Sequence, residues 1–140
     1  MWQKSYEVEA TDVTPEQIWK VWADVNNWNE WDAAIEYART KDPFEKGCKF
    51  ELKPKGGPKV TIEIIECNQG RDFTDLTRFP LAKMYGLHEV KSIGDSRILL
   101  KTTMTVKGPL GFLWRKLVAQ NIVNDLPVDT ANIIALARTR

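Results

Sequence analysis

A helical pattern far longer than an average helix closes the chain, and this feature constrains the fold most. From Leu110 to about Ala137, apolar residues recur at i, i+3 and i+4 spacing. The stretch before it, from Ile35 to Val106, instead has the short alternating segments typical of strands. Runs of strands followed by one long helix predict an α+β fold with an antiparallel sheet.

Alternation is clearest in two neighbouring segments. Within residues 47–54, Cys48, Phe50 and Leu52 alternate with three charged residues at positions 49, 51 and 53. The turn at residues 55–58 then leads to Val60, Ile62 and Ile64, which continue the alternation. Pairing across this turn sets Phe50 against Ile62. Further strands are predicted at 35–40, 71–79, 84–92 and 97–106.

The N-terminal part predicts one more strand and two short helices. Residues 2–9 are typical of a strand. Thr14 is a good N-cap, Pro15 suits the first helical position, and Gln17 completes a capping box. A second short helical turn is expected within 24–32. The whole prediction is a single domain, 1–140, in which a curved antiparallel sheet of about seven strands surrounds the long C-terminal helix.

Charge and composition exclude several classes of function. The chain has 20 basic and 19 acidic residues among its 140, so its net charge of +1 gives no reason to expect a nucleic-acid partner. No apolar run is long enough to span a membrane, and no secretory signal is visible, so we expect a cytoplasmic protein. Cys48 and Cys67 have no metal-ligand spacing, and we expect neither metal nor cofactor. The predicted pairing places Cys67 on the opposite face from Cys48, so no disulfide is expected.

Several motifs resemble a known superfamily. Residues 13–19 (Val-Thr-Pro-Glu-Gln-Ile-Trp), followed by the tryptophan-containing stretch 23–32, resemble the opening signature of START-like proteins. Residues 106–111 and 125–127 resemble the final strand and C-terminal helix of the polyketide cyclase/dehydrase and lipid transport branch. The resemblance implies a helix-grip (Bet v 1-like) fold with a deep cavity. Members bind lipids, sterols, polyketides, quinones or plant hormones, and some cyclise or dehydrate polyketides.

The primary hypothesis is that the chain binds or carries a small hydrophobic molecule, such as a lipid, polyketide or quinone, in an internal cavity. Asn121 is predicted on the apolar side of the long helix, either bonded to a strand or acting as a polar handle for the ligand. The predicted apolar wall comprises Phe50, Leu52, Ile62, Ile64, Leu100 and Met104 from the sheet, with Leu113 and Leu117 from the helix.

Two other classes of function remain open. His88, the only histidine, could act as a general base oriented by Asp75 on a neighbouring strand, as an enzyme of the cyclase/dehydratase kind would need. The alternative is a structural or solvent-facing His88. A third hypothesis is a protein-interaction module, which would expose a large apolar patch.

Two further groups of residues bear on these alternatives. Apolar residues beside Arg115 and Lys116 could bring the start of the long helix to a membrane, although a buried helix start with two solvated cations explains the same pattern. Four tryptophans are predicted to pack the core rather than hold a ligand. They are Trp19, Trp22, Trp28 and Trp31.

Overall fold

The structure is a computed structural model that describes all of residues 1–140. The strands are β1 (Trp2–Thr11), β2 (Ile35–Arg39), β3 (Lys49–Pro54), β4 (Val60–Asn68), β5 (Asp72–Phe79), β6 (Ala82–Gly94) and β7 (Arg97–Lys107). The helices are α1 (Pro15–Ala23), the 3-10 helix η1 (Val25–Glu30), α2 (Gly111–Trp114), the π-helix η2 (Arg115–Ala119) and α3 (Gln120–Ala137).

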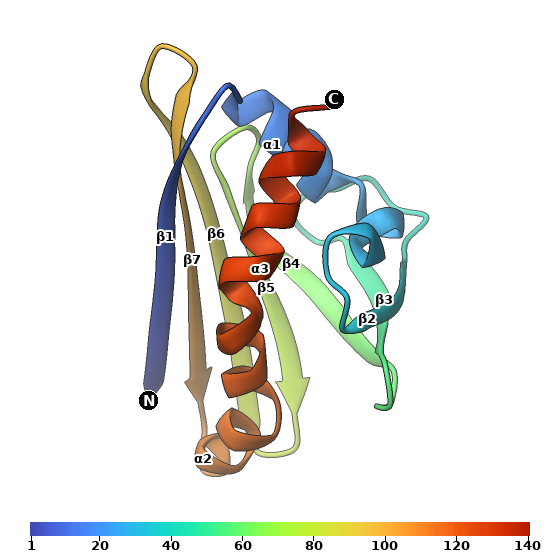
Figure 1. Cartoon of the computed structure of the whole chain (residues 1–140). Helices are drawn as coiled ribbons and strands as arrows, with labels where there is room; N and C mark the ends of the chain where they lie inside the picture. The colour runs from blue at the N-terminus through green and yellow to red at the C-terminus, as the bar shows by residue number, and fades with distance from the viewer.

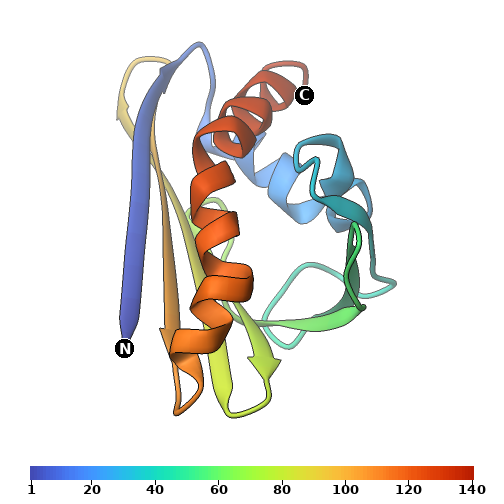
Figure 2. The ribbon, with the colours of Figure 1, turned by 60° about the horizontal axis from the view of Figure 1, so that its bottom comes forward.

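The seven strands form one antiparallel sheet in the order β1-β7-β6-β5-β4-β3-β2. The sheet curves, and α3 lies across its concave side, as Figure 1 shows. In Figure 2, α3 stands in front of the sheet with β1 to its left, and α1 and η1 lie beside its C-terminal half. The predicted α+β fold, a curved sheet around a long C-terminal helix with two short helices after the first strand, is confirmed. No helix is long and apolar enough to cross a bilayer.

The predicted capping box starts α1. The Thr14 hydroxyl accepts a hydrogen bond from the backbone N–H of Gln17 at 3.2 Å, and the Gln17 side chain accepts one from the N–H of Thr14 at 2.8 Å. With Pro15 in the first turn, the helix begins where the sequence predicts. Its apolar face, including Trp19 and Trp22, is buried.

Aromatic side chains fill the end of the interior that α1 covers. The four tryptophans of residues 19–31 are at most 9% exposed and belong to one apolar cluster, so the prediction that they form core is confirmed. Edge-to-face contacts join Trp22 to Phe73 at 5.2 Å and Trp28 to Phe50 at 5.1 Å. Ile133 and Ile134 of α3 also belong to this main cluster. A second, smaller cluster lies around Met84, Met104, Val106 and Ala119.

The long helix differs from the predicted pattern near its start. Leu113 and Leu117 are 37% and 57% exposed, although i, i+3 and i+4 spacing places them on the buried arc. The cause is η2, because one π-helical turn inserts a residue and rotates the residues before it relative to those after it. Ala119 and its neighbours, rather than Leu117, therefore face the sheet.

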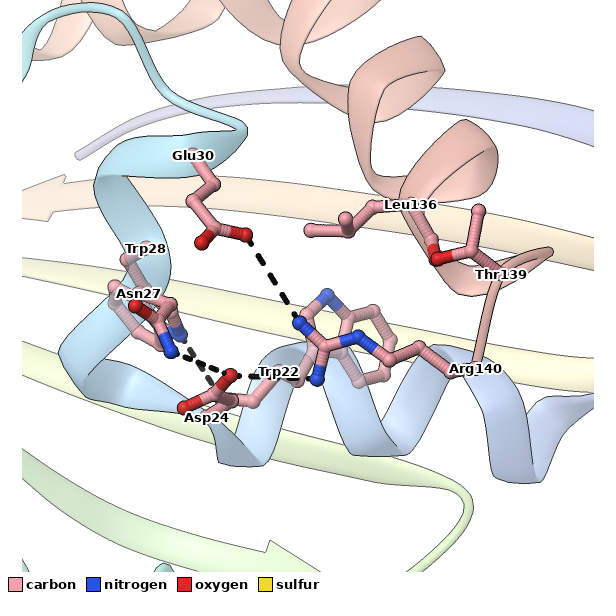
Figure 3. A network of polar contacts seen from close by, with 8 residues as sticks. All are labelled: Trp22, Asp24, Asn27, Trp28, Glu30, Leu136, Thr139 and Arg140. Carbon is pink, nitrogen blue, oxygen red and sulfur yellow. Dashed lines mark hydrogen bonds and ion pairs between the residues drawn. The ribbon is translucent and has the colours of Figure 1, made fainter.

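The far end of α3 is held against α1 and η1 by a polar network (Figure 3). The guanidinium of Arg140 lies 3.3 Å from the Asp24 carboxylate and 4.0 Å from that of Glu30. Asn27 also donates to Asp24, at 2.9 Å. These contacts are partly exposed and orient the helix end more than they stabilise it.

Candidate functional site

Four polar side chains interrupt the apolar inner face of the sheet. They are Asp75 and Thr77 on β5, His88 on β6 and Thr102 on β7, and we call them the polar band. Alternate residues of β7 are buried. The buried residue two positions before Thr102 belongs to the main apolar cluster, and the one two positions after it belongs to the smaller cluster. The register pairs His88 with Thr102, which places both side chains on that same inner face.

The centre of the polar band is a hydrogen-bonded pair. Nε2 of His88 lies 2.8 Å from Oδ2 of Asp75, and the two side chains are 17% and 11% exposed. With the carboxylate oxygen as acceptor, Nε2 is the donor in this hydrogen bond. Phe73 stacks on the imidazole at 4.4 Å, which fixes the plane of the ring. No hydrogen bond within the protein involves the other ring nitrogen, Nδ1.

Gly86 makes the space for this pair. It lies between the two residues on the inner face, opposite Asp75 in the register. A Cβ at Gly86 would lie 2.8 Å from Oδ1 of Asp75 and 3.0 Å from Nε2 of His88. Any side chain here would push the pair apart, so glycine is required for close approach.

Three hydroxyl groups lie around the pair. Thr77 and Thr102 are only 2% and 8% exposed, and no hydrogen bond within the protein involves either hydroxyl. Tyr6 of β1 pairs in register with Thr102 and is half-buried. The one side-chain polar atom that is fully buried without a partner is Nε1 of Trp31, outside the polar band, so these hydroxyls are not sealed from solvent. This row of hydroxyls beside the imidazole is suited to hold an oxygen-bearing group.

A buried carboxylate on α3 adds a second titratable group. Burial, together with the nearby carboxylates of Asp32 and Asp125, raises the pKa of Asp129 to about 7. Burial also raises the pKa of Asp32, which accepts a hydrogen bond from the backbone of Ala34. No group of side chains in the structure could hold a metal ion.

Most of the predicted wall faces inward. Phe50, Ile62, Ile64, Leu100 and Met104 are buried on the inner face, where they pack in the two clusters. Leu52 is half-buried beside them.

The three helix residues of the predicted site lie elsewhere. Besides the exposed Leu113 and Leu117, Asn121 is exposed, and its amide donates to the carbonyl of Leu117 at 3.4 Å. The predicted placement of Asn121 on the buried arc is therefore wrong. Roles in ligand binding for all these residues stay predictions.

Sequence reasoning missed Gly86, Asp129 and the role of Thr102. Two of them leave a signal in the sequence: a glycine inside a strand, and a threonine at an inward position between apolar residues. Two open hollows, of about 410 and 440 Å³, lie on the surface and contain no polar-band residue. The candidate site therefore depends on the inner-face side chains alone.

The cysteine faces also differ from prediction. A register shift between Ile64 and Glu66 sets Cys67 opposite Phe73, on the inner face with Cys48. Both thiols are free, as expected. The prediction that the two cysteines lie on opposite faces of the sheet is wrong.

No protein-family model matches the sequence, and none of the curated proteins matches it either. Solved structures do match. A hypothetical protein from Helicobacter pylori superposes with a TM-score of 0.77 at 14% identity, over 97% of this chain and 88% of that one. A START superfamily protein from Mycobacterium smegmatis gives 0.72 at 16% identity, over 95% and 97%. A Streptomyces aromatase/cyclase gives 0.72 at 13% identity, over 99% and 97%. The chain has the START-like, Bet v 1-like helix-grip fold.

Proposed function

We propose that the chain binds a small, largely apolar molecule between the inner face of the sheet and α3, and that the polar band holds an oxygen-bearing group of that molecule. The observation that carries the proposal is the polar band itself: Thr102 lies in register beside His88 on the otherwise apolar inner face, and no hydrogen bond within the protein involves its hydroxyl. The only side-chain polar atom that is fully buried without a partner is Nε1 of Trp31, so the Thr102 hydroxyl is accessible to water or to a ligand.

The surroundings of the polar band support an apolar ligand skeleton. Met84, Met104 and Val106 lie toward one end, and methionine adapts to irregular shapes. Phe73 and Trp22 lie at the other end. A flat or chain-like molecule such as a lipid, polyketide or quinone suits these walls, with a hydroxyl or carbonyl at the polar band.

A matched pair of probes tests this function. We expect the intrinsically fluorescent β-naphthol to bind saturably, and its methyl ether, which cannot donate a hydrogen bond, to bind about fivefold or more weakly. Thr102→Val should reduce that preference. Thr103→Val, one residue along on the outer face, should leave it unchanged. Equal affinity for the two probes, or no saturable binding, would overturn the proposal.

The inward-facing pair supports a second function, acid–base catalysis. In this reading Nδ1 of His88 takes a proton from a carbon next to a carbonyl, and Asp75 stabilises the imidazolium that forms. An enolate results, and a neighbouring hydroxyl donates a hydrogen bond to its oxygen. This is the type of step that ring closure or dehydration of a polyketide begins with.

Isotope exchange separates catalysis from binding. In deuterated water, the enzyme reading expects the protein to accelerate deuterium uptake next to the carbonyl of tetralone, and His88→Gln to abolish that acceleration. If β-naphthol binds and tetralone exchange stays at the background rate, the chain is a binding protein rather than an enzyme of this kind.

A further inference from the structure

The exposed large apolar side chains of this protein gather at one end. Six are exposed in the whole chain, and four of them are Leu81, Phe112, Leu113 and Leu117. They lie on the β5–β6 turn, α2 and η2 and are 65%, 62%, 37% and 57% exposed, respectively. Figures 1 and 2 show α2 beside this turn, at the end of the molecule away from the C-terminus. We call this region the α2 surface.

The turn and the helix form one rigid unit. The backbone N–H of Leu110 donates to the carbonyl of Leu81 at 3.0 Å, and the indole N–H of Trp114 donates to the carbonyl of Pro80 at 3.0 Å. Trp114 also stacks on Phe79 at 4.6 Å. The exposed apolar side chains are therefore presented on a fixed frame.

Leu81 is held in an unfavourable backbone conformation. Its φ is +58°, a left-handed value that a bulky residue rarely adopts. Glycine or asparagine would occupy this turn position at lower cost, and neither would present an apolar side chain. A strained leucine that is 65% exposed indicates a surface that contacts something.

The charges around these apolar side chains are cations, and the nearby carboxylate of Glu63 is already paired with Arg78 at 2.9 Å. Lys83, Lys107 and Lys116 are exposed, Arg115 is half-buried, and none forms an ion pair within the protein. The stretches 76–88 and 102–124, which include this end, contain no aspartate or glutamate. Unpaired cations around exposed apolar groups complement an anionic, partly apolar surface.

We propose that the α2 surface docks on an anionic lipid bilayer. Phe112, Leu113, Leu117 and Leu81 enter the interface between head groups and acyl chains, and the cations contact lipid phosphates and carboxylates. A second copy of this chain fits less well, because pairing two α2 surfaces would bring like charges together. The proposal does not depend on what the inner face binds.

Vesicle co-sedimentation of the whole chain tests the docking. We expect binding to vesicles of phosphatidylcholine mixed with phosphatidylserine, weaker binding at physiological salt than at low salt, and little binding to phosphatidylcholine alone. Phe112→Ser combined with Leu81→Ser should reduce the partition coefficient about tenfold or more. Lys83→Gln combined with Lys116→Gln should reduce it about fivefold per cation.

Matched control variants come from elsewhere on the surface. Val128→Ser removes an equally exposed apolar side chain from α3, and Lys91→Gln removes an exposed, unpaired cation from β6. Both should bind vesicles as the parent chain does. Absence of binding to anionic vesicles at low salt would overturn the proposal, as would equal losses in the control variants. A dimer that forms without lipid and that Phe112→Ser dissociates would assign the surface to a second copy instead.

Discussion

The carboxylate of Asp75 and the imidazole of His88 face each other at 2.8 Å across two antiparallel strands, on the inner side of the sheet. The pair is largely shielded from solvent, flanked by Phe73 on one side and set over a glycine on the other. An exposed pair would be a weak surface contact. A shielded pair has a fixed geometry, and removing one of its partners strongly destabilises the folded state.

Gly86→Ala should disturb this pair directly. The new Cβ would lie within 3.0 Å of both side chains, so the pair must separate, and we expect a loss of about 1–3 kcal/mol in the free energy of unfolding. The Nε2 proton of His88 should give a resolved downfield NMR signal in the parent chain and lose it in the variant. Gly111→Ala is the control, since its Cβ would meet Val106 at an ordinary 3.5 Å. Equal stability of Gly86→Ala and the parent chain would contradict the close approach.

A double-mutant cycle measures the coupling of the pair. Asp75→Val leaves the Nε2 proton of His88 without an acceptor, and His88→Phe leaves a buried carboxylate without a donor, so each should cost about 2–3 kcal/mol. The double variant should lose less than the sum, because both polar groups are then gone. Urea denaturation gives all four free energies. Additive losses would show that the two side chains do not act as a pair.

Thr102→Val should stabilise the protein. The replacement exchanges a hydroxyl that forms no hydrogen bond within the protein for a methyl group and keeps the branched shape that β7 accommodates, so we expect a gain of about 0.5–1 kcal/mol. Thr103→Val, on the half-buried outer face of the same strand, should change stability less. Thermal unfolding of the two variants side by side makes the measurement. A loss of stability in Thr102→Val would indicate that this hydroxyl has a partner in solution.

The two clearest successes of sequence reasoning rest on local patterns. The capping box at Thr14 and Gln17 fixed the start of α1, and alternation placed Phe50 opposite Ile62. The failures follow from single inserted residues. The π-turn of η2 rotates Leu113 and Leu117 out of the buried arc, and the register shift after Ile64 turns Cys67 inward. A periodic pattern cannot show where an extra residue enters.

The candidate site was only partly predictable. The strand pattern placed Asp75 and His88 on neighbouring strands, and His88 is the only histidine in the chain, so the two could be proposed as a pair. That the pair faces inward depends on register across β5, β6 and β7, which is a tertiary property. Asp129 was unpredictable for a similar reason: its burial depends on how α3 meets the segment after η1, where Asn132 donates to the carbonyl of Trp31 at 3.2 Å.

Asp129 should make the stability of the fold depend on pH. Burial raises its pKa to about 7 in the folded state, above its unfolded value of 3.8, so the folded chain holds a proton that the unfolded chain releases. Stability should therefore fall as the pH rises from about 4 to about 7 and change little from this group above that. Because solvent screens part of the interaction, we expect the decrease to be on the order of 1–2 kcal/mol.

Asp129→Asn removes the proton exchange, so the variant should be more stable than the parent chain at pH 8 and differ little from it at pH 4. Urea denaturation across this pH range measures the difference between the two curves. Asp95→Asn, an exposed change in the turn between β6 and β7, is the control and should leave the pH profile unchanged. A difference between Asp129→Asn and the parent chain that stays constant from pH 4 to pH 8 would show that Asp129 does not titrate in this range.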